Sequence, residues 1–157
     1  MARLDEVDLY WSYDGDFGVG KDGDLLDTSD DLIQAKVQEI QSIVKSEIGD
    51  WKYHPNFAAT LSDFVGKPNS RTTGTDIRDR IISVLVSNNV LSAGDFDVRV
   101  VPVDIHSVLV MIKVFAMATE RNSLEQGQPI VVSLVYDTNE GSALYLPESQ
   151  IERNYFF

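Results

Sequence analysis

The stretch that decides the fold is residues 96–118, FDVRVVPVDIHSVLVMIKVFAMA, the most apolar part of the chain. From Val108 onward, successive side chains fall on opposite faces of an extended strand, and both faces are apolar apart from Lys113. Valine, isoleucine and phenylalanine dominate, which is typical of a central strand covered by helices on at least one face. A membrane span is disfavoured, because the run is about half of the ~20 residues that a spanning helix needs. We expect two strands that meet in a turn between Pro102 and Ser107.

The composition limits the class of protein. A chain of 157 residues can bury one core without disulfides or metals. It has 25 acidic and 13 basic residues, a net charge of -12 and no basic cluster, so nucleic acid is not expected as a partner. The absence of cysteine excludes disulfides and thiolate metal sites, and it fits folding in a reducing cytoplasm. The first residues show no apolar run behind a basic start, so no secretory signal is expected.

Acidic residues are concentrated at the N-terminus. Residues 1–31 hold ten of them against Arg3 and Lys21. Two motif-like matches there are attributed to chance. The glycines fit a dinucleotide-binding pattern, but the aspartates beside them would repel a pyrophosphate, and the acids do not follow the register of a calcium loop. Residues 1–29 are expected to form an irregular acidic arm, followed by a single domain over residues 30–157.

Helical periodicity marks the first half of that domain. A long helix is expected over residues 30–48, because apolar side chains recur on one face behind capping hydroxyls. Ile43 and Ile48 lie partly off this apolar stripe, so we expect them to contact a partner. A short helix is expected within residues 51–66, and a second long helix is expected to begin at a capping Thr75.

Further strands follow the central stretch. Residues 130–136 and 142–146 are apolar runs on either side of a plausible hairpin turn, residues 137–141. The expected fold class is α+β, with a mostly antiparallel sheet of three to five strands packed by two long helices and one short helix. The chain ends in Tyr155, Phe156 and Phe157, which we expect either to fold back or to insert into a neighbouring subunit.

Two groups of residues carry a resemblance to a known family. They are Gly49, Asp50, Pro55, Phe57 and Leu61 after the first helix, and Asp97 and Arg99 at the start of the central strands. In order and spacing they resemble the contractile-phage baseplate wedge family, which includes protein W of P2-like phages, the T-even wedge protein on which the tail sheath starts, and a type VI secretion baseplate subunit. Asp50 and Asp97 stand where the family has glutamates, and Ala58 and Val98 where it has a glycine and a proline.

The resemblance implies a non-catalytic structural subunit. Its partners would be other baseplate wedge subunits and the first ring of tail sheath protein, with tail tube or hub proteins as further candidates. Six copies would stand in the baseplate of the virion, after assembly in the host cytoplasm. In the family the sheath protein extends terminal strands to its neighbours and the baseplate protein offers the first acceptor sheet. The hairpin of residues 130–146 is our candidate edge, where a proline at Ala143 is expected to remove a ladder donor.

The residue types of the motif positions indicate structural roles. Gly49 ends a helix, and Pro55 and Phe57 pin a loop onto the core. Arg99 has two interpretations: it ties down a neighbouring loop through charged hydrogen bonds, or it is an exposed strand residue.

An enzyme is the alternative, because some members of the resembled family have carried a lysozyme label. A peptidoglycan-cleaving hydrolase needs two carboxylates at a fixed separation, one with a raised pKa, and 25 acids always allow a pair to be drawn. His54 and His106 are the only histidines, and neither lies in a metal-ligand motif. No catalytic, cofactor-binding or metal-binding residue is therefore assigned. A third possibility is an acidic adaptor for a basic partner.

Overall fold

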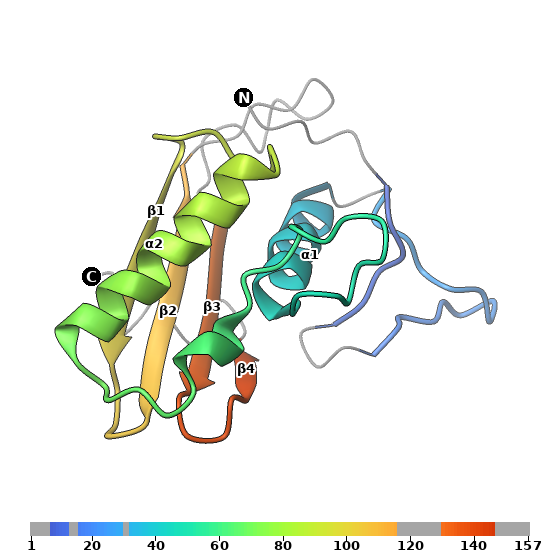
Figure 1. The fold of residues 1–157 in the computed structure, drawn as a ribbon. Coiled ribbons are helices and arrows are strands. Elements are labelled where there is room, and N and C mark those ends of the chain that lie inside the picture. Colours follow the sequence, from blue (N-terminus) through green and yellow to red (C-terminus); the bar gives the residue numbers. More distant parts are fainter. Residues whose placement is uncertain (1–6, 13–15, 30–31, 116–129, 147–157) are drawn as a thin grey trace.

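The computed structural model describes residues 7–12, 16–29, 32–115 and 130–146. They form an α+β domain in which two α-helices and one short 3-10 helix pack on a four-stranded antiparallel sheet (Figure 1). The strands lie in the order β1 (Phe96–Pro102), β2 (Ser107–Val114), β3 (Ile130–Asp137) and β4 (Ala143–Leu146). The predicted α+β class and the antiparallel sheet are confirmed.

Strand β2 is the centre of the sheet, as its composition predicts. Val110 pairs with Val100 of β1 on one side and with Leu134 of β3 on the other. The even-numbered residues of β2 belong to the core that the helices share, whereas Leu109 and Met111 point the other way and belong to a separate small apolar cluster. All of these side chains are buried. The strand is thus buried on both faces except at Lys113 and Ser107, which are half-buried.

The helices cover one face of the sheet. Helix α1 (Leu32–Lys45) packs against β3, and helix α2 (Arg71–Ser87) packs against β1 beside the short helix η1 (Leu61–Phe64). Their apolar side chains join the inward-facing strand residues in one core, whose most buried large members include Ile40, Ile43, Ile77, Ile81, Leu85, Ile112 and Leu134. Burial of each such side chain stabilises the fold by about 1.5–3 kcal/mol.

Ile43 corrects a prediction. We expected this residue to lie on a partner-facing edge of the first helix, but its side chain is 0% exposed and packs in the core. The apolar face of α1 is wider than the narrow stripe in the sequence, because both α2 and strand β3 contact the helix. Ile48, the other residue of that pair, is 71% exposed.

Helix α1 ends earlier than expected, at Lys45 instead of residue 48. The loop that follows replaces the next helical bond. The Ser46 amide still donates to the Ser42 carbonyl at 3.1 Å, but the Glu47 amide donates to Asp50 Oδ2 at 2.8 Å and the Ile43 carbonyl accepts from the Ala59 amide at 3.1 Å. The turn that follows contains Gly49 at a φ of 97°, a left-handed conformation that favours glycine.

Helix α2 begins earlier than expected. Its N-cap is Ser70, whose Oγ accepts from the Thr73 amide at 3.2 Å. Thr75, the predicted cap, lies inside the helix, where its Oγ1 donates to the Arg71 carbonyl at 3.0 Å.

The N-terminal segment folds into a unit that we call the N-terminal junction, residues 7–12 and 16–29. Three isolated antiparallel bridges join its strands, between Leu9 and Asp27, Trp11 and Phe17, and Val19 and Leu25. The junction lies beside α1 (Figure 1), and the side chain of Gln38 bonds to its backbone.

None of the helices in the described part of the chain has the length and apolar character needed to cross a membrane.

Candidate partner-binding edge

Strand β4 presents backbone groups to the outer edge of the sheet. The Asp137 amide donates to the Ser142 carbonyl at 2.8 Å, which makes that pair a hydrogen-bonded one. Pairs alternate along an antiparallel ladder, so Leu144 also bonds to β3 while Ala143 and Tyr145 turn their N–H and C=O groups outward. In the strand order, no described strand follows β4. This edge therefore has the geometry of an acceptor for an added strand.

The register corrects the expectation for Ala143. We expected its amide to be a ladder donor, but it pairs with Tyr136 at a position without hydrogen bonds, so its N–H points away from β3. A proline at Ala143 would remove an outward-facing donor and leave the β3–β4 ladder intact. The ladder donor is the next residue, Leu144.

The opposite edge, β1, is differently arranged. The Val103 amide donates to the Ser107 carbonyl at 2.9 Å, so by alternation Val98, Val100 and Pro102 face outward. The Nε of Arg78, on α2, donates to the Val98 carbonyl at 3.0 Å. Pro102 has no amide hydrogen. Two of these outward positions are thus unable to make the full pair of bonds that an added strand requires.

Two tyrosine hydroxyls fix the β3–β4 hairpin to the helical layer. Tyr145 of β4 donates to the Gln41 carbonyl of α1 at 2.8 Å, and Tyr136 of β3 donates to the Leu61 carbonyl at 2.7 Å. Burial raises the pKa of Tyr145 above its ordinary value. Burial, with smaller contributions from the charges of Glu47 and other acids, raises the pKa of Tyr136 to about 12. Both hydroxyls therefore stay protonated donors at neutral pH and hold β4 in place.

The first group of motif residues forms the loop between α1 and η1. Asp50 Oδ2 accepts from the Glu47 amide at 2.8 Å and closes the turn at Gly49. Phe57 packs against the core, with Trp51 edge-to-face at 5.3 Å between ring centroids. Leu61 is buried, as a core residue should be. Pro55 is exposed, so the expectation that it pins the loop by packing is wrong.

The second group lies on β1, at the far side of the sheet from β4. Arg99 Nε lies 3.3 Å from Asp97 Oδ2, and the Arg99 side chain is 63% exposed. Of the two interpretations of Arg99, the structure supports the exposed strand residue, because this partner is only two residues away on the same strand. Such a pair contributes little to stability.

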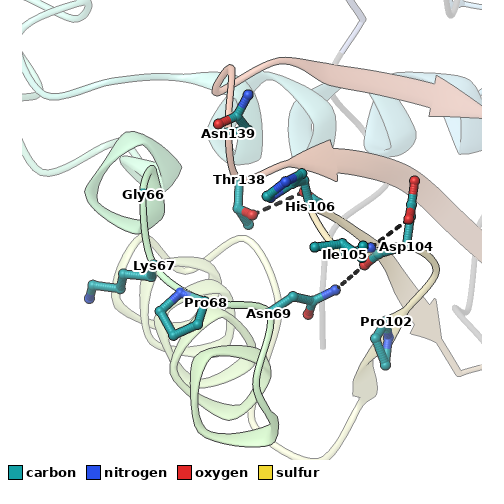
Figure 2. A pocket seen from close by; sticks show the side chains of 10 residues that line it. All are labelled: Gly66, Lys67, Pro68, Asn69, Pro102, Asp104, Ile105, His106, Thr138 and Asn139. Carbon is teal, nitrogen blue, oxygen red and sulfur yellow. Dashed lines mark hydrogen bonds between the residues drawn. The ribbon is translucent and has the colours of Figure 1, made fainter.

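A pocket of about 580 Å³ lies where three turns meet at one end of the sheet (Figure 2). Two of its polar side chains, Asn69 and Thr138, donate to backbone carbonyls. Asn69 Nδ2 donates to the Asp104 carbonyl at 2.5 Å and to the Ser107 carbonyl at 3.1 Å. Thr138 donates twice to the His106 carbonyl, from its amide at 2.7 Å and from Oγ1 at 3.0 Å. These bonds tie the turns together and give the pocket a structural role.

Two described carboxyls have pKa values that the structure shifts, and neither is shifted upward. Asp27 and Asp137 have shifted pKa values, and both are lowered, by hydrogen bonds from Ser29 and from the Glu140 and Asn139 amides respectively. A glycosidase acid needs a raised pKa instead. Within the described ranges, no group of three or more histidine, aspartate or glutamate side chains is placed to hold a metal ion.

The structure brings some predicted residues together and separates others. Ala143 lies on the candidate edge, and Ile48 is exposed in the motif loop. Tyr155, Phe156 and Phe157 lie outside the described residues. Sequence reasoning missed Arg78 and Tyr145. Tyr145 could have been found, because in an alternating strand it falls on the same face as Ala143; nothing local marks Arg78 as the partner of a β1 carbonyl.

Comparison of the chain with protein-family models, with curated proteins and with solved structures finds no match.

Proposed function

We propose that this chain is a structural subunit of a contractile-phage tail baseplate wedge, and that β4 accepts a strand of the tail sheath protein. The observation that carries the proposal is the outer edge of β4, where Ala143 and Tyr145 direct two N–H and two C=O groups away from β3. The motif resemblance supplies the family, and the edge geometry supplies a means of attachment.

The energetics of such an attachment are modest per bond. Each main-chain hydrogen bond to an added strand contributes about 1 kcal/mol, so four bonds give a weak contact unless side chains also fit. Leu144 is 64% exposed on the face of the sheet away from the helices, where it can contact a partner strand. Specificity is therefore assigned to side chains around Leu144, and avidity to the six copies in the ring.

Other surfaces of the domain serve the remaining partners in this proposal. The outer surfaces of the helices and the exposed Ile48 contact other wedge subunits. Tail tube or hub proteins are further neighbours. In this proposal the acidic N-terminal residues 1–29 face a neighbouring subunit and gain protection from protease when the virion assembles. No catalytic role is proposed, because the motif resemblance indicates a structural subunit.

The test is assembly without this protein. Tails produced in its absence should lack a complete baseplate carrying extended sheath, and added purified protein should restore them. Normal extended sheath on complete baseplates made without the chain would contradict the proposal. Clearing of peptidoglycan by the purified protein, abolished by mutating one acid, would favour the hydrolase instead.

A further inference from the structure

The N-terminal junction is a built structure with two distinct sides. Its central residues bond in a closed cycle: the Tyr10 amide donates to the Leu26 carbonyl, the Leu26 amide to Gly18 and the Gly18 amide to Tyr10, at 2.9–3.0 Å. A Cβ on Gly18 would lie 2.7 Å from Tyr10 Cδ1 and 3.1 Å from Leu26 Cδ1. Tyr10 and Leu26 therefore close over Gly18 on one side, which requires a glycine there.

The other side of the junction is apolar and exposed. The three bridges are all pairs without hydrogen bonds, so their side chains project together from the same side of each ladder. Four of the six side chains are large, apolar and exposed: Leu9 at 41%, Phe17 at 59%, Val19 at 61% and Leu25 at 54%. Exposed apolar groups clustered in this way mark an interaction surface.

Hydrogen bonds from buried side chains hold the junction against α1. Gln38 is 1% exposed, and its Oε1 accepts from the Trp11 amide at 3.0 Å while its Nε2 donates to the Leu9 carbonyl at 2.8 Å. The buried Thr28 accepts from the Asp8 amide at 2.9 Å. These bonds fix the Leu9–Trp11 strand to the domain, so a partner that binds the apolar side finds it already ordered.

The charge around this surface selects the partner. The described residues of the junction include five aspartates and a single lysine, Lys21. The pKa of Asp27, the bridge partner of Leu9, is lowered by hydrogen bonds from Ser29, so this carboxylate stays charged at neutral pH. An apolar centre with a charged rim is the usual anatomy of a protein interface, and a negative rim favours a positive partner.

We propose that the apolar side of the N-terminal junction binds a basic, amphipathic segment of a partner protein, with leucine-like side chains over Phe17, Val19 and Leu25 and lysine or arginine facing the aspartates. Anionic lipid and nucleic acid are disfavoured as ligands by the same negative charge. The proposal does not rest on the baseplate function, because it concerns the isolated chain.

The test is a titration of the full chain with a short synthetic peptide in which lysine alternates with leucine. The variant Phe17→Ser with Val19→Ser should bind about tenfold more weakly or worse, since burial of the two apolar side chains together contributes more than about 1.4 kcal/mol, the equivalent of a factor of ten. Both residues are exposed, so the variant should keep the parent melting transition. The matched control is Ile105→Ser, whose side chain is 76% exposed elsewhere on the surface.

Three outcomes support the proposal together: binding of the parent, loss in the double variant, and parent-like affinity of Ile105→Ser. A peptide of lysine and serine should bind far more weakly, and added salt should weaken the lysine–leucine peptide. The proposal is overturned if the parent does not bind, if the folded double variant binds like the parent, if Ile105→Ser weakens binding equally, or if the serine peptide binds as well. Binding to anionic vesicles in preference to the peptide would also overturn it.

Discussion

The two edges of the sheet differ in whether their outward-facing backbone N–H and C=O groups can bond to an added strand. At β1, a guanidinium from α2 occupies the Val98 carbonyl and Pro102 lacks a donor. At β4, Ala143 and Tyr145 direct both donors and acceptors outward, and a tyrosine hydroxyl fixes the strand from its helical side. Exposed edges recruit strands unless side chains or prolines prevent it. Among the described residues, side chains and a proline protect the β1 edge and not the β4 edge, and this asymmetry is the basis of the proposed attachment.

The largest effect expected from this comparison is on stability, from a proline within the β4 ladder. Leu144→Pro removes a hydrogen bond to β3, so the free energy of unfolding should fall by about 2–3 kcal/mol. Ala143→Pro removes only an outward donor and should cost less than about 1 kcal/mol. Urea unfolding of both variants measures the difference. Equal losses would show that the register of β4 is wrong.

The hydroxyl that holds β4 gives the next effect. Tyr145→Phe leaves the Gln41 carbonyl without its partner and should lower the free energy of unfolding by about 1–2 kcal/mol. Tyr53→Phe is the matched control, since Tyr53 is 82% exposed and its loss should change nothing measurable. Identical unfolding curves for the two variants would mean that β4 does not depend on this bond.

The same tyrosines predict a pH dependence. The ordinary pKa of tyrosine is about 10, whereas the folded protein raises that of Tyr136 to about 12. The unfolded chain therefore loses the proton first, and stability that is complete below pH 10 should fall as the pH rises from about 10 to about 12. In Tyr136→Phe this decline should be smaller than in the parent, as measured by urea unfolding across that range. A decline as steep in the variant would point to other groups.

A smaller effect is expected at the protected edge. Arg78→Ala frees the Val98 carbonyl and should cost about 1 kcal/mol, because the side chain is partly exposed. Arg71→Ala on the same helix is the control, because the Arg71 side chain makes no hydrogen bond within the described part of the chain. If the two variants unfold at the same urea concentration, Arg78 does not protect β1.

The smallest effect is expected from the motif residue on β1. Arg99→Ala removes an exposed pair with Asp97 and should change the free energy of unfolding by less than about 0.5 kcal/mol. A loss above about 1.5 kcal/mol in thermal or urea unfolding would restore the interpretation in which Arg99 ties down a loop.

The fold class could be predicted because β2 and α1 have clear periodicity. Alternation placed Val108 and Leu109 on opposite faces, and a hairpin turn was correctly placed at residues 137–141. The helix boundaries were harder to predict from the sequence. Helix α1 ends where Asp50 and Ala59 take the bonding partners of Glu47 and Ile43, and these bonds depend on the folded loop. Ser70 and Thr75 are equally good caps in sequence alone.

The candidate edge was only partly predictable. The hairpin could be chosen from its position in the chain, but which amides of β4 face outward depends on a one-residue register that the sequence leaves open. For that reason the expectation that the Ala143 amide donates to the β3–β4 ladder was wrong. The prediction that Ile43 contacts a partner failed for a related reason, since burial at the side of a helix depends on which elements pack there.

The measurement that tests the central claim most directly is sheath nucleation on baseplates that carry Ala143→Pro, with Val100→Pro as the matched change on β1. Both substitutions remove an outward-facing amide, and both proteins must first show the cooperative melting transition of the parent. The account predicts that Val100→Pro baseplates carry extended sheath like the parent, while most tails with Ala143→Pro lack it. Folded Ala143→Pro protein that nucleates sheath as well as the parent would contradict strand addition at β4.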